Sequence, residues 1–181
     1  NLDFATIQDI HSIKRQINAK QKAAGREFNV KLGHGGIREI EFFAQTQQLV
    51  YGGREPRLRV PDTLSALGAL CETGHISAQT RDALADAYLF LRHTEHRLQM
   101  QEDRQTHSLP ATPAALEDFA RFMEYPSAKK FLDELEKKTS AVKSLYAGLF
   151  TESPSLAKAG NLVFTGIEEA TREIKQILTI R

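Results

Sequence analysis

The chain has 181 residues, of which 41% are hydrophobic and 26% charged, enough apolar material for one compact core of ordinary domain size. Lysine and arginine number 24 against 23 aspartates and glutamates, which excludes a strongly basic protein and gives no reason to expect a nucleic-acid partner. The single cysteine, Cys71, excludes an internal disulfide, and the sequence lacks both a signal peptide and the run of about 20 apolar residues that spans a membrane. We therefore expect a cytoplasmic protein without a membrane partner.

Helical periodicity dominates the chain from its first residues. Apolar residues at steps of three and four predict an amphipathic helix from about Asp3 to Gly25. Asp62, Ser77 and Thr112 are the expected N-caps of later helices, because their side chains can accept hydrogen bonds from the first free backbone N–H groups. Together these patterns predict a helical bundle, with further helices over residues 36–51, 62–74, 77–103, 112–125, 131–149 and 167–180.

One segment has the alternation of a β-strand. Phe28, Val30 and Leu32 alternate with polar residues before a glycine cluster, which predicts a strand of about five residues. Since an isolated strand leaves its backbone groups unpaired, we expect its partners in a part of a longer protein that is missing here. The start at Asn1 rather than at a methionine also favours a piece of a longer protein. The expected fold is mostly α, a helical bundle with one short N-terminal strand.

A glycine turn follows this strand, in the sequence KLGHGGIREIEF over residues 31–42. Its glycines can bring backbone N–H groups close to an anion at the positive end of the next helix, where Lys31 and Arg38 add charge. The turn lacks the Gly-Lys-Ser/Thr of a Walker A loop and the βαβ context of a dinucleotide site. Taken alone, the pattern favours a tight turn, with a phosphate site as the alternative.

Two of the predicted helices carry polar rows. Such rows are typical of a solvated helix face with surface ion pairs, and the alternative is that both rows line a cleft between helices. The first row consists of Arg38, Glu41, Gln45 and Gln48, and the second of Arg92, Glu95, Gln99 and Glu102, with His93, Arg97 and Arg104 on an adjacent face.

Histidines near the second row do not predict a metal site. His93 and His96 flank Glu95 at a spacing that lacks the HExxH or HxxEH order of known zinc sites. His107 lies in a polar loop after the longest helix, a common location for binding residues, but it is weak evidence alone.

Several motifs in a fixed order resemble the bifunctional glutamine synthetase adenylyltransferase/adenylyl-removing enzymes. They are KLGHGGIREIEF, QTQQLVYGG at 45–53, PRLR at 56–59, EHRLQ at 95–99 and QTHSLP at 105–110. The match covers most of residues 1–165. That family has two similar halves, each a nucleotidyltransferase domain followed by a helical domain. Asn29, the motif GIREIEF and the segment 160–166 resemble the corresponding parts of the N-terminal, adenylyl-removing half.

The resemblance implies a domain division and a location for the chemistry. Residues 1–33 would end a nucleotidyltransferase domain that also contains the missing partners of the strand, 34–150 would form the helical bundle, and 151–181 would be a linker and the start of the next region. The family holds two Mg²⁺ ions on an Asp-x-Asp pair after a Gly-Ser turn, and this sequence has no such arrangement. We therefore expect no catalytic or metal-binding residue in this chain, and no activity from it alone.

For the parent enzyme the resemblance implies transfer of AMP to a tyrosine of glutamine synthetase and its phosphorolytic removal, with ATP, phosphate and Mg²⁺, in the regulation of nitrogen assimilation. Glutamine synthetase and the PII signal protein are the implied partners. The implied nucleotide- or substrate-binding residues are Lys31, Gly33, Gly35, Gly36, Arg38 and Glu41 at the turn, and Arg92, Arg97 and Arg104 on the helical wall of a cleft.

Two other interpretations remain open at this point. The region could be an interaction module that docks glutamine synthetase or PII without contacting a nucleotide. It could also be the helical domain of a related uridylyltransferase.

Overall fold

A computed structural model describes residues 28–102 and 106–151 of the chain. The chain divides into two compact units, Asn1–Leu149 and Phe150–Arg181, and nearly all described residues belong to the first. The helices predicted over 3–25 and 167–180 lie outside the described residues, so both remain predictions.

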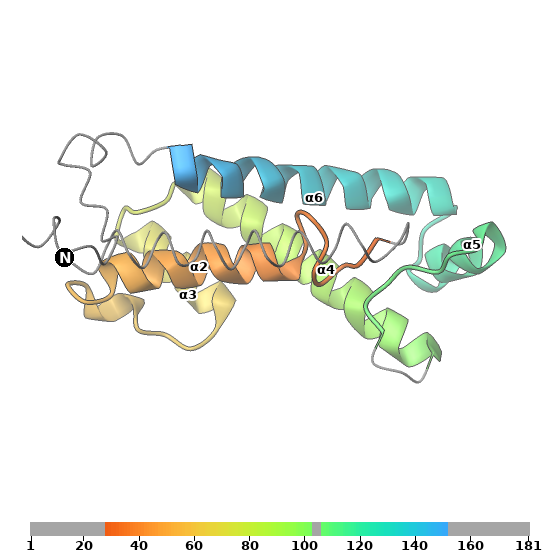
Figure 1. Cartoon of the computed structure of the whole chain (residues 1–181), viewed down its shortest axis with the longest axis horizontal. Coiled ribbons are helices and arrows are strands. Elements are labelled where there is room, and N and C mark those ends of the chain that lie inside the picture. The colour runs from red at the N-terminus through yellow and green to blue at the C-terminus, as the bar shows by residue number, and fades with distance from the viewer. Residues whose placement is uncertain (1–27, 103–105, 152–181) are drawn as a thin grey trace, which may run out of the picture. The chain divides into compact units, whose positions relative to one another are not determined.

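Five α-helices and a short 3-10 helix make up most of the described residues (Figure 1). The mostly helical bundle predicted from the sequence is therefore confirmed. The expected caps also form: Asp62 Oδ1 accepts from Ser65 N at 2.8 Å, and Thr112 Oγ1 accepts from Ala115 N at 3.3 Å. The elements are α2 (Ile37–Tyr51), η1 (Pro56–Leu58), α3 (Thr63–Glu72), α4 (Ala78–Glu102), α5 (Pro113–Phe122) and α6 (Ala128–Thr151).

The bundle is built around α4, the longest helix. Helices α2, α3 and α4 contact one another pairwise. Helix α6 is held by Phe131, which is fully buried and lies 5.5 Å from the Phe119 ring of α5 and 6.1 Å from the Phe90 ring of α4. Edge-to-face and tilted ring pairs of this kind add to the stabilisation from apolar burial. Within the described ranges, no helix is long and apolar enough to cross a membrane.

The β-strand predicted over residues 28–32 is wrong for the described residues, which form only an isolated bridge within the chain, and pairing with a domain outside this chain stays a prediction. Asn29 forms a single antiparallel bridge with Ser108, flanked by hydrogen bonds from Val30 N to His107 O at 2.8 Å and from Leu109 N to Phe28 O at 3.0 Å. The Asn29 side chain ends the pairing, because its Oδ1 accepts from the backbone N–H groups of the second and third following residues and turns the chain. This pairing therefore requires no further sheet.

Candidate functional site

The glycine turn packs directly against the backbone of α6. Gly35 has φ +77°, and a Cβ built on it would lie 2.2 Å from the carbonyl oxygen of Thr139 in α6. A Cβ on Gly33 or Gly36 would also meet a backbone oxygen of the turn, at 2.4 and 2.7 Å. The absence of side chains at these positions therefore permits the fold of the turn.

Most backbone donors of this turn are already used within the protein. Gly35 N donates to Glu39 Oε2 at 2.9 Å, and Gly36 N donates to Gly33 O at 2.8 Å. The first turn of α2 follows the same pattern, with Arg38 N donating to Lys31 O at 3.1 Å. Since an anion would need free N–H groups, the geometry favours the tight-turn interpretation. A binding role for the glycines stays a prediction.

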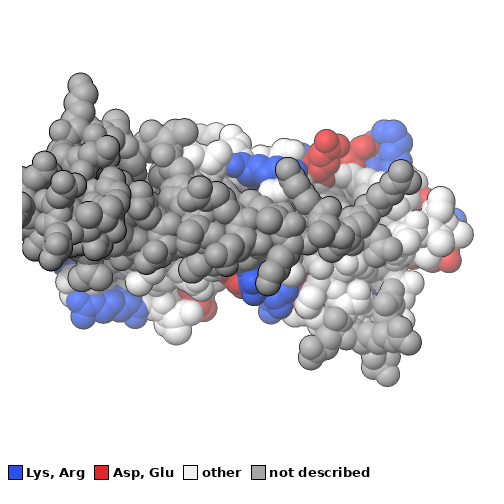
Figure 2. Space-filling model, in the orientation of Figure 1, with Lys and Arg blue, Asp and Glu red and all other residues white. Residues whose placement is uncertain are grey.

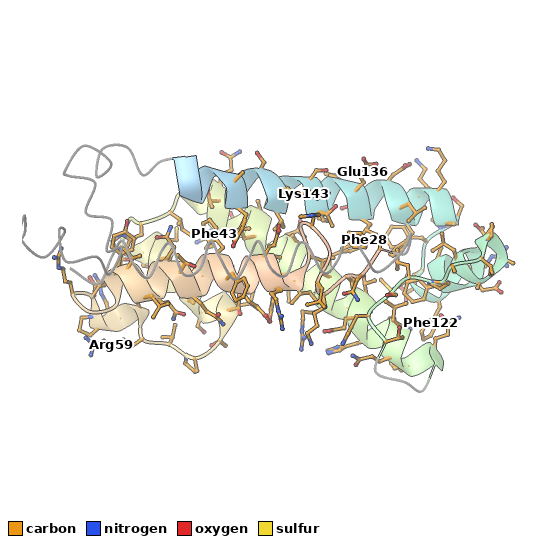
Figure 3. All side chains as sticks on the ribbon, viewed as in Figure 1. Phe28, Phe43, Arg59, Phe122, Glu136 and Lys143 are labelled. Atoms are coloured by element: carbon orange, nitrogen blue, oxygen red, sulfur yellow. The ribbon has the colours of Figure 1, made fainter. Side chains whose placement is uncertain are left out.

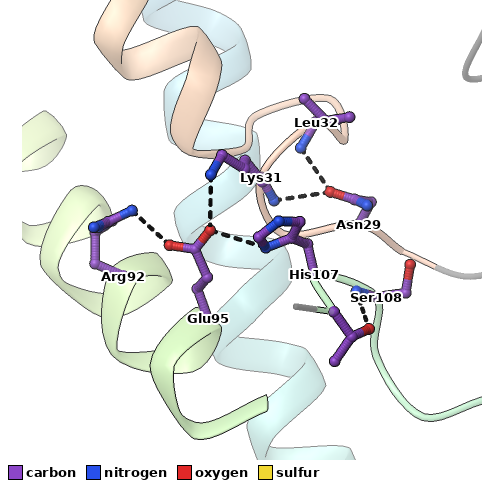
Figure 4. Close-up of polar contacts among 8 residues, drawn as sticks. Asn29, Lys31, Leu32, Arg92, Glu95, His107 and Ser108 are labelled. Atoms are coloured by element: carbon purple, nitrogen blue, oxygen red, sulfur yellow. Dashed lines mark hydrogen bonds and ion pairs between the residues drawn. The ribbon is translucent and has the colours of Figure 1, made fainter. Parts of the chain in front are cut away.

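A buried carboxylate beside this turn gathers three basic side chains (Figure 4). Glu95, in α4, is only 2% exposed. Its Oε2 accepts from Arg92 Nη1 at 2.6 Å, and its Oε1 lies 3.4 Å from Lys31 Nζ and 3.0 Å from His107 Nδ1. The approach of His107 does not have hydrogen-bond geometry, so this is a close polar contact and not a hydrogen bond. We call these four residues the Glu95 cluster.

The three basic residues of the Glu95 cluster come from separate parts of the chain. Lys31 follows the β-bridge on one segment, His107 belongs to the facing segment, and Arg92 lies one turn before Glu95 on α4. Their side chains are 32%, 24% and 36% exposed, respectively. The carboxylate is therefore inside the protein, while the Lys31 and Arg92 side chains reach the solvent.

The burial of Glu95 contradicts a solvated face for this part of the second polar row. The sequence did contain a signal: Glu95 follows Leu91 by four residues and precedes Leu98 by three, so all three share the apolar face of α4. An acidic residue on such a face must have cationic partners nearby.

Arg97 has a different environment from the Glu95 cluster. Its guanidinium lies 4.5 Å from the centre of the Phe122 ring, its Nε is 3.2 Å from His93 Nε2, and its Nη2 is 3.8 Å from Glu124 Oε1. It thus joins α4 to the end of α5. Arg104 lies outside the described residues.

Arg38 and Glu41 are half-buried at the start of α2. Their side chains make no hydrogen bond or ion pair with any residue of the described ranges 28–102 and 106–151. The structure thus brings Lys31 and Arg92 together on Glu95, and places Arg38 next to Lys31 through the backbone.

The opposite end of α2 forms a separate cavity of about 630 Å³ (Figure 3, where Arg59 lies at this end and Phe28 at the other). Its wall is fixed by Gln48, whose Nε2 donates to the carbonyls of Leu58 and Val60, and by Arg59, whose Nε donates to Gly52 O at 2.8 Å. Leu49, 65% exposed, contributes apolar surface. Gln45 and Gln48 from the first polar row therefore line this cavity, away from Glu95.

A smaller cavity of about 410 Å³ lies between the glycine turn and α6, lined by His34, Glu39, Lys143, Tyr146 and Ala147. Glu39 pairs with His34 here, with 3.6 Å between His34 Nδ1 and Glu39 Oε1. Burial, followed by the charge of Glu39, raises the pKa of Tyr146 to about 12.

This raised pKa predicts a loss of stability in alkali. Because the folded protein binds the Tyr146 proton more tightly than the unfolded chain, the stabilisation is complete below the ordinary tyrosine pKa of about 10 and is lost as the pH rises from there toward 12. Absorbance at 295 nm should show a tyrosine ionising near pH 12, and Tyr146→Phe should remove that step. The same step remaining after Tyr146→Phe, or disappearing with Tyr51→Phe, would contradict the assignment.

Within the described part of the chain, no group of three or more His, Cys, Asp or Glu side chains is arranged to hold a metal ion. In Figure 2, the visible Lys and Arg side chains form separate small groups, some of them beside Asp and Glu side chains. The net charge of the protein therefore indicates no particular partner, and the paired basic side chains of Lys31 and Arg92 are the more informative feature.

Comparisons with known proteins find close relatives. A family model described as GlnD PII-uridylyltransferase matches residues 10–150. The bifunctional glutamine synthetase adenylyltransferase/adenylyl-removing enzyme of Agrobacterium fabrum is 51% identical over 99% of the chain. The enzymes with the same name from Xanthobacter autotrophicus and Rhodopseudomonas palustris are 50% and 46% identical over 90% and 99% of the chain. The chain spans only 18%, 17% and 19% of the length of these three relatives.

Proposed function

Because the chain belongs to the GlnD PII-uridylyltransferase family, we propose that it is a helical module of a longer nucleotidyltransferase that acts on glutamine synthetase. The relatives at 46–51% identity are named as adenylyltransferases and adenylyl-removing enzymes, which supports AMP, rather than UMP, as the transferred group. Asn29 and the GIREIEF motif support the adenylyl-removing half. The proposed role of the parent enzyme is to attach AMP to glutamine synthetase and remove it, regulating nitrogen assimilation in the cytoplasm.

The Glu95 cluster supports a contact with the anionic nucleotide. Lys31 and Arg92 are two basic side chains, whereas Glu95 is one acidic side chain, so a formal positive charge remains at the solvent side. Arg38, the second residue of α2, donates its backbone N–H to Lys31 O at 3.1 Å, and no described side chain forms an ion pair with its guanidinium. Cationic side chains that flank a phosphate group are well suited to hold it. The convergence of Lys31 and Arg92 on Glu95 is the observation on which the proposed nucleotide contact rests.

Metal binding and bond making would belong to other parts of the longer protein. ATP or phosphate would be the co-substrate and Mg²⁺ the metal, but the described residues of this chain do not fit a metal site. The full sequence also has no Asp-x-Asp pair. The role left for this chain is to orient the nucleotide, and the chain alone should neither transfer AMP nor release ADP.

Lys31→Ala and Arg38→Ala in the longer enzyme should each weaken nucleotide binding about tenfold, because each removes a charge-assisted contact to phosphate. Affinity for glutamine synthetase should stay within about twofold. Isothermal titration with ATP and ADP measures the first quantity, and titration with glutamine synthetase measures the second. Arg54→Ala is the matched control, since Arg54 is an exposed arginine at the opposite end of α2.

If Lys31→Ala and Arg38→Ala both leave the nucleotide affinity unchanged, the proposed nucleotide contact is contradicted. Arg97→Ala is a poor probe of it, because Arg97 packs on Phe122 and its loss also perturbs the contact between α4 and α5.

A second candidate function, docking of a protein partner, is favoured by the cavity at the end of α2. Its lining is mainly apolar, and Leu49 is exposed beside it. Glutamine synthetase and PII are the partners to test. If Leu49→Glu abolishes the binding of either protein while Lys31→Ala and Arg38→Ala leave nucleotide binding intact, the docking function replaces the first.

A further inference from the structure

We propose that Glu95 is a positioning residue that holds Lys31 and Arg92 in place for an anionic phosphate group. The inference rests on the proposed function and names the residue that organises its cationic site. Glu95 itself faces the interior, at 2% exposure, so it acts through its partners and does not touch the nucleotide.

The geometry separates the two cations on one carboxylate. Arg92 binds Oε2 at 2.6 Å, whereas Lys31 approaches Oε1 at 3.4 Å, so each oxygen holds a different head group (Figure 4). Both side chains are long and would otherwise sample many rotamers in solvent. Because the carboxylate attracts both, it keeps two like charges close together, an arrangement that they would not adopt alone.

His107 completes the arrangement from the other side of the β-bridge. Its Nδ1 lies 3.0 Å from the same Oε1 that faces Lys31. The hydrogen bond from Val30 N to His107 O at 2.8 Å links the two segments that carry these side chains. The backbone next to Lys31 is therefore fixed relative to α4. The lysine side chain is restrained at its backbone by this hydrogen bond and at its Nζ by Glu95.

A purely structural role would not favour a carboxylate at this position. Glu95 lies between Leu91 and Leu98 on the apolar face of α4, where a leucine would bury apolar surface without the cost of removing a charge from water. A buried acid with two solvent-reaching cations is instead suited to present positive charge outward at fixed positions. The surplus positive charge of the Glu95 cluster then attracts phosphate.

The test compares variants of the longer enzyme by steady-state kinetics with ATP and ADP. Glu95→Gln retains the shape of the side chain but removes its charge, and should raise KM for the nucleotide about five- to tenfold with kcat changed less than about twofold. Leu91→Ala is the control: it removes buried apolar volume one turn earlier on the same helix, so it lowers stability but leaves the charges of the Glu95 cluster unchanged. Leu91→Ala should leave KM unchanged.

The outcomes distinguish this inference from the proposed function. If Lys31→Ala and Arg92→Ala raise KM but Glu95→Gln does not, Glu95 is not a positioning residue and the proposed function stands. An equal rise in KM with Leu91→Ala also overturns the inference, because the effect would then be one of stability. If none of the Lys31, Arg92 and Glu95 variants changes KM, the nucleotide contact itself is refuted.

Discussion

Replacing Gly35 with alanine is expected to lower the free energy of unfolding by about 2–5 kcal/mol, the sum of backbone strain and overpacking. Gly35 has φ +77°, which strains any residue with a Cβ, and its Cβ would lie 2.2 Å from Thr139 O. That oxygen belongs to the backbone of α6, so no side-chain rotation relieves the clash. Urea denaturation of the 181-residue chain, followed by circular dichroism, measures the change.

Gly74→Ala provides the matched control for this prediction. Gly74 also has φ +77°, but a Cβ built on it has no neighbour within 4 Å. Its replacement therefore introduces backbone strain alone and should cost about 1–2 kcal/mol. Equal losses for Gly35→Ala and Gly74→Ala would show that the glycine turn does not pack tightly against α6.

Replacing Glu95 with alanine should cost about 3 kcal/mol, the lower end of what breaking a buried ion pair costs. The lower end applies because Lys31, Arg92 and His107 are each partly exposed and can turn toward water once the carboxylate is gone. The same denaturation experiment measures this loss. Hydrogen exchange should also show faster exchange at Val30, whose N–H bonds to the backbone of His107.

A double-mutant cycle with Arg92→Ala separates the ion pair from other effects of removing Glu95. Coupling of about 1–3 kcal/mol is expected between the two residues, because Arg92 Nη1 and Glu95 Oε2 are 2.6 Å apart. Asp133→Ala, which breaks the exposed Lys129–Asp133 pair, should change stability by about 0.5 kcal/mol or less. Additive Glu95 and Arg92 effects would mean that this buried pair contributes no more than the exposed one.

The sequence predicted the helices well because their start and stop residues act locally. Asp62 and Thr112 cap neighbouring N–H groups, and the helix after Pro113 begins at the expected residue. The predicted strand failed for the opposite reason. The pairing of Asn29 with Ser108 depends on contacts between residues far apart in sequence, which local alternation cannot reveal.

For the candidate site, the sequence indicated some of the residues but not how they come together. Lys31 and Arg92 were both expected to bind, but neither polar row indicated that they meet on Glu95. From the sequence, Glu95 was assigned to a polar row, and the buried face that it shares with Leu91 and Leu98 was missed. Identifying its partners required the fold. The glycines form a tight turn, their binding role stays a prediction, and the contact of Gly35 with Thr139 could not be derived from spacing.

Isothermal titration of ATP into the longer enzyme with both Lys31 and Arg92 changed to alanine tests the central claim most directly. Since the two cations on Glu95 are proposed to hold the phosphates, the double variant should bind ATP at least about thirtyfold more weakly than the unaltered enzyme. Its affinity for glutamine synthetase should be retained. ATP binding of undiminished strength in a folded double variant would contradict the account.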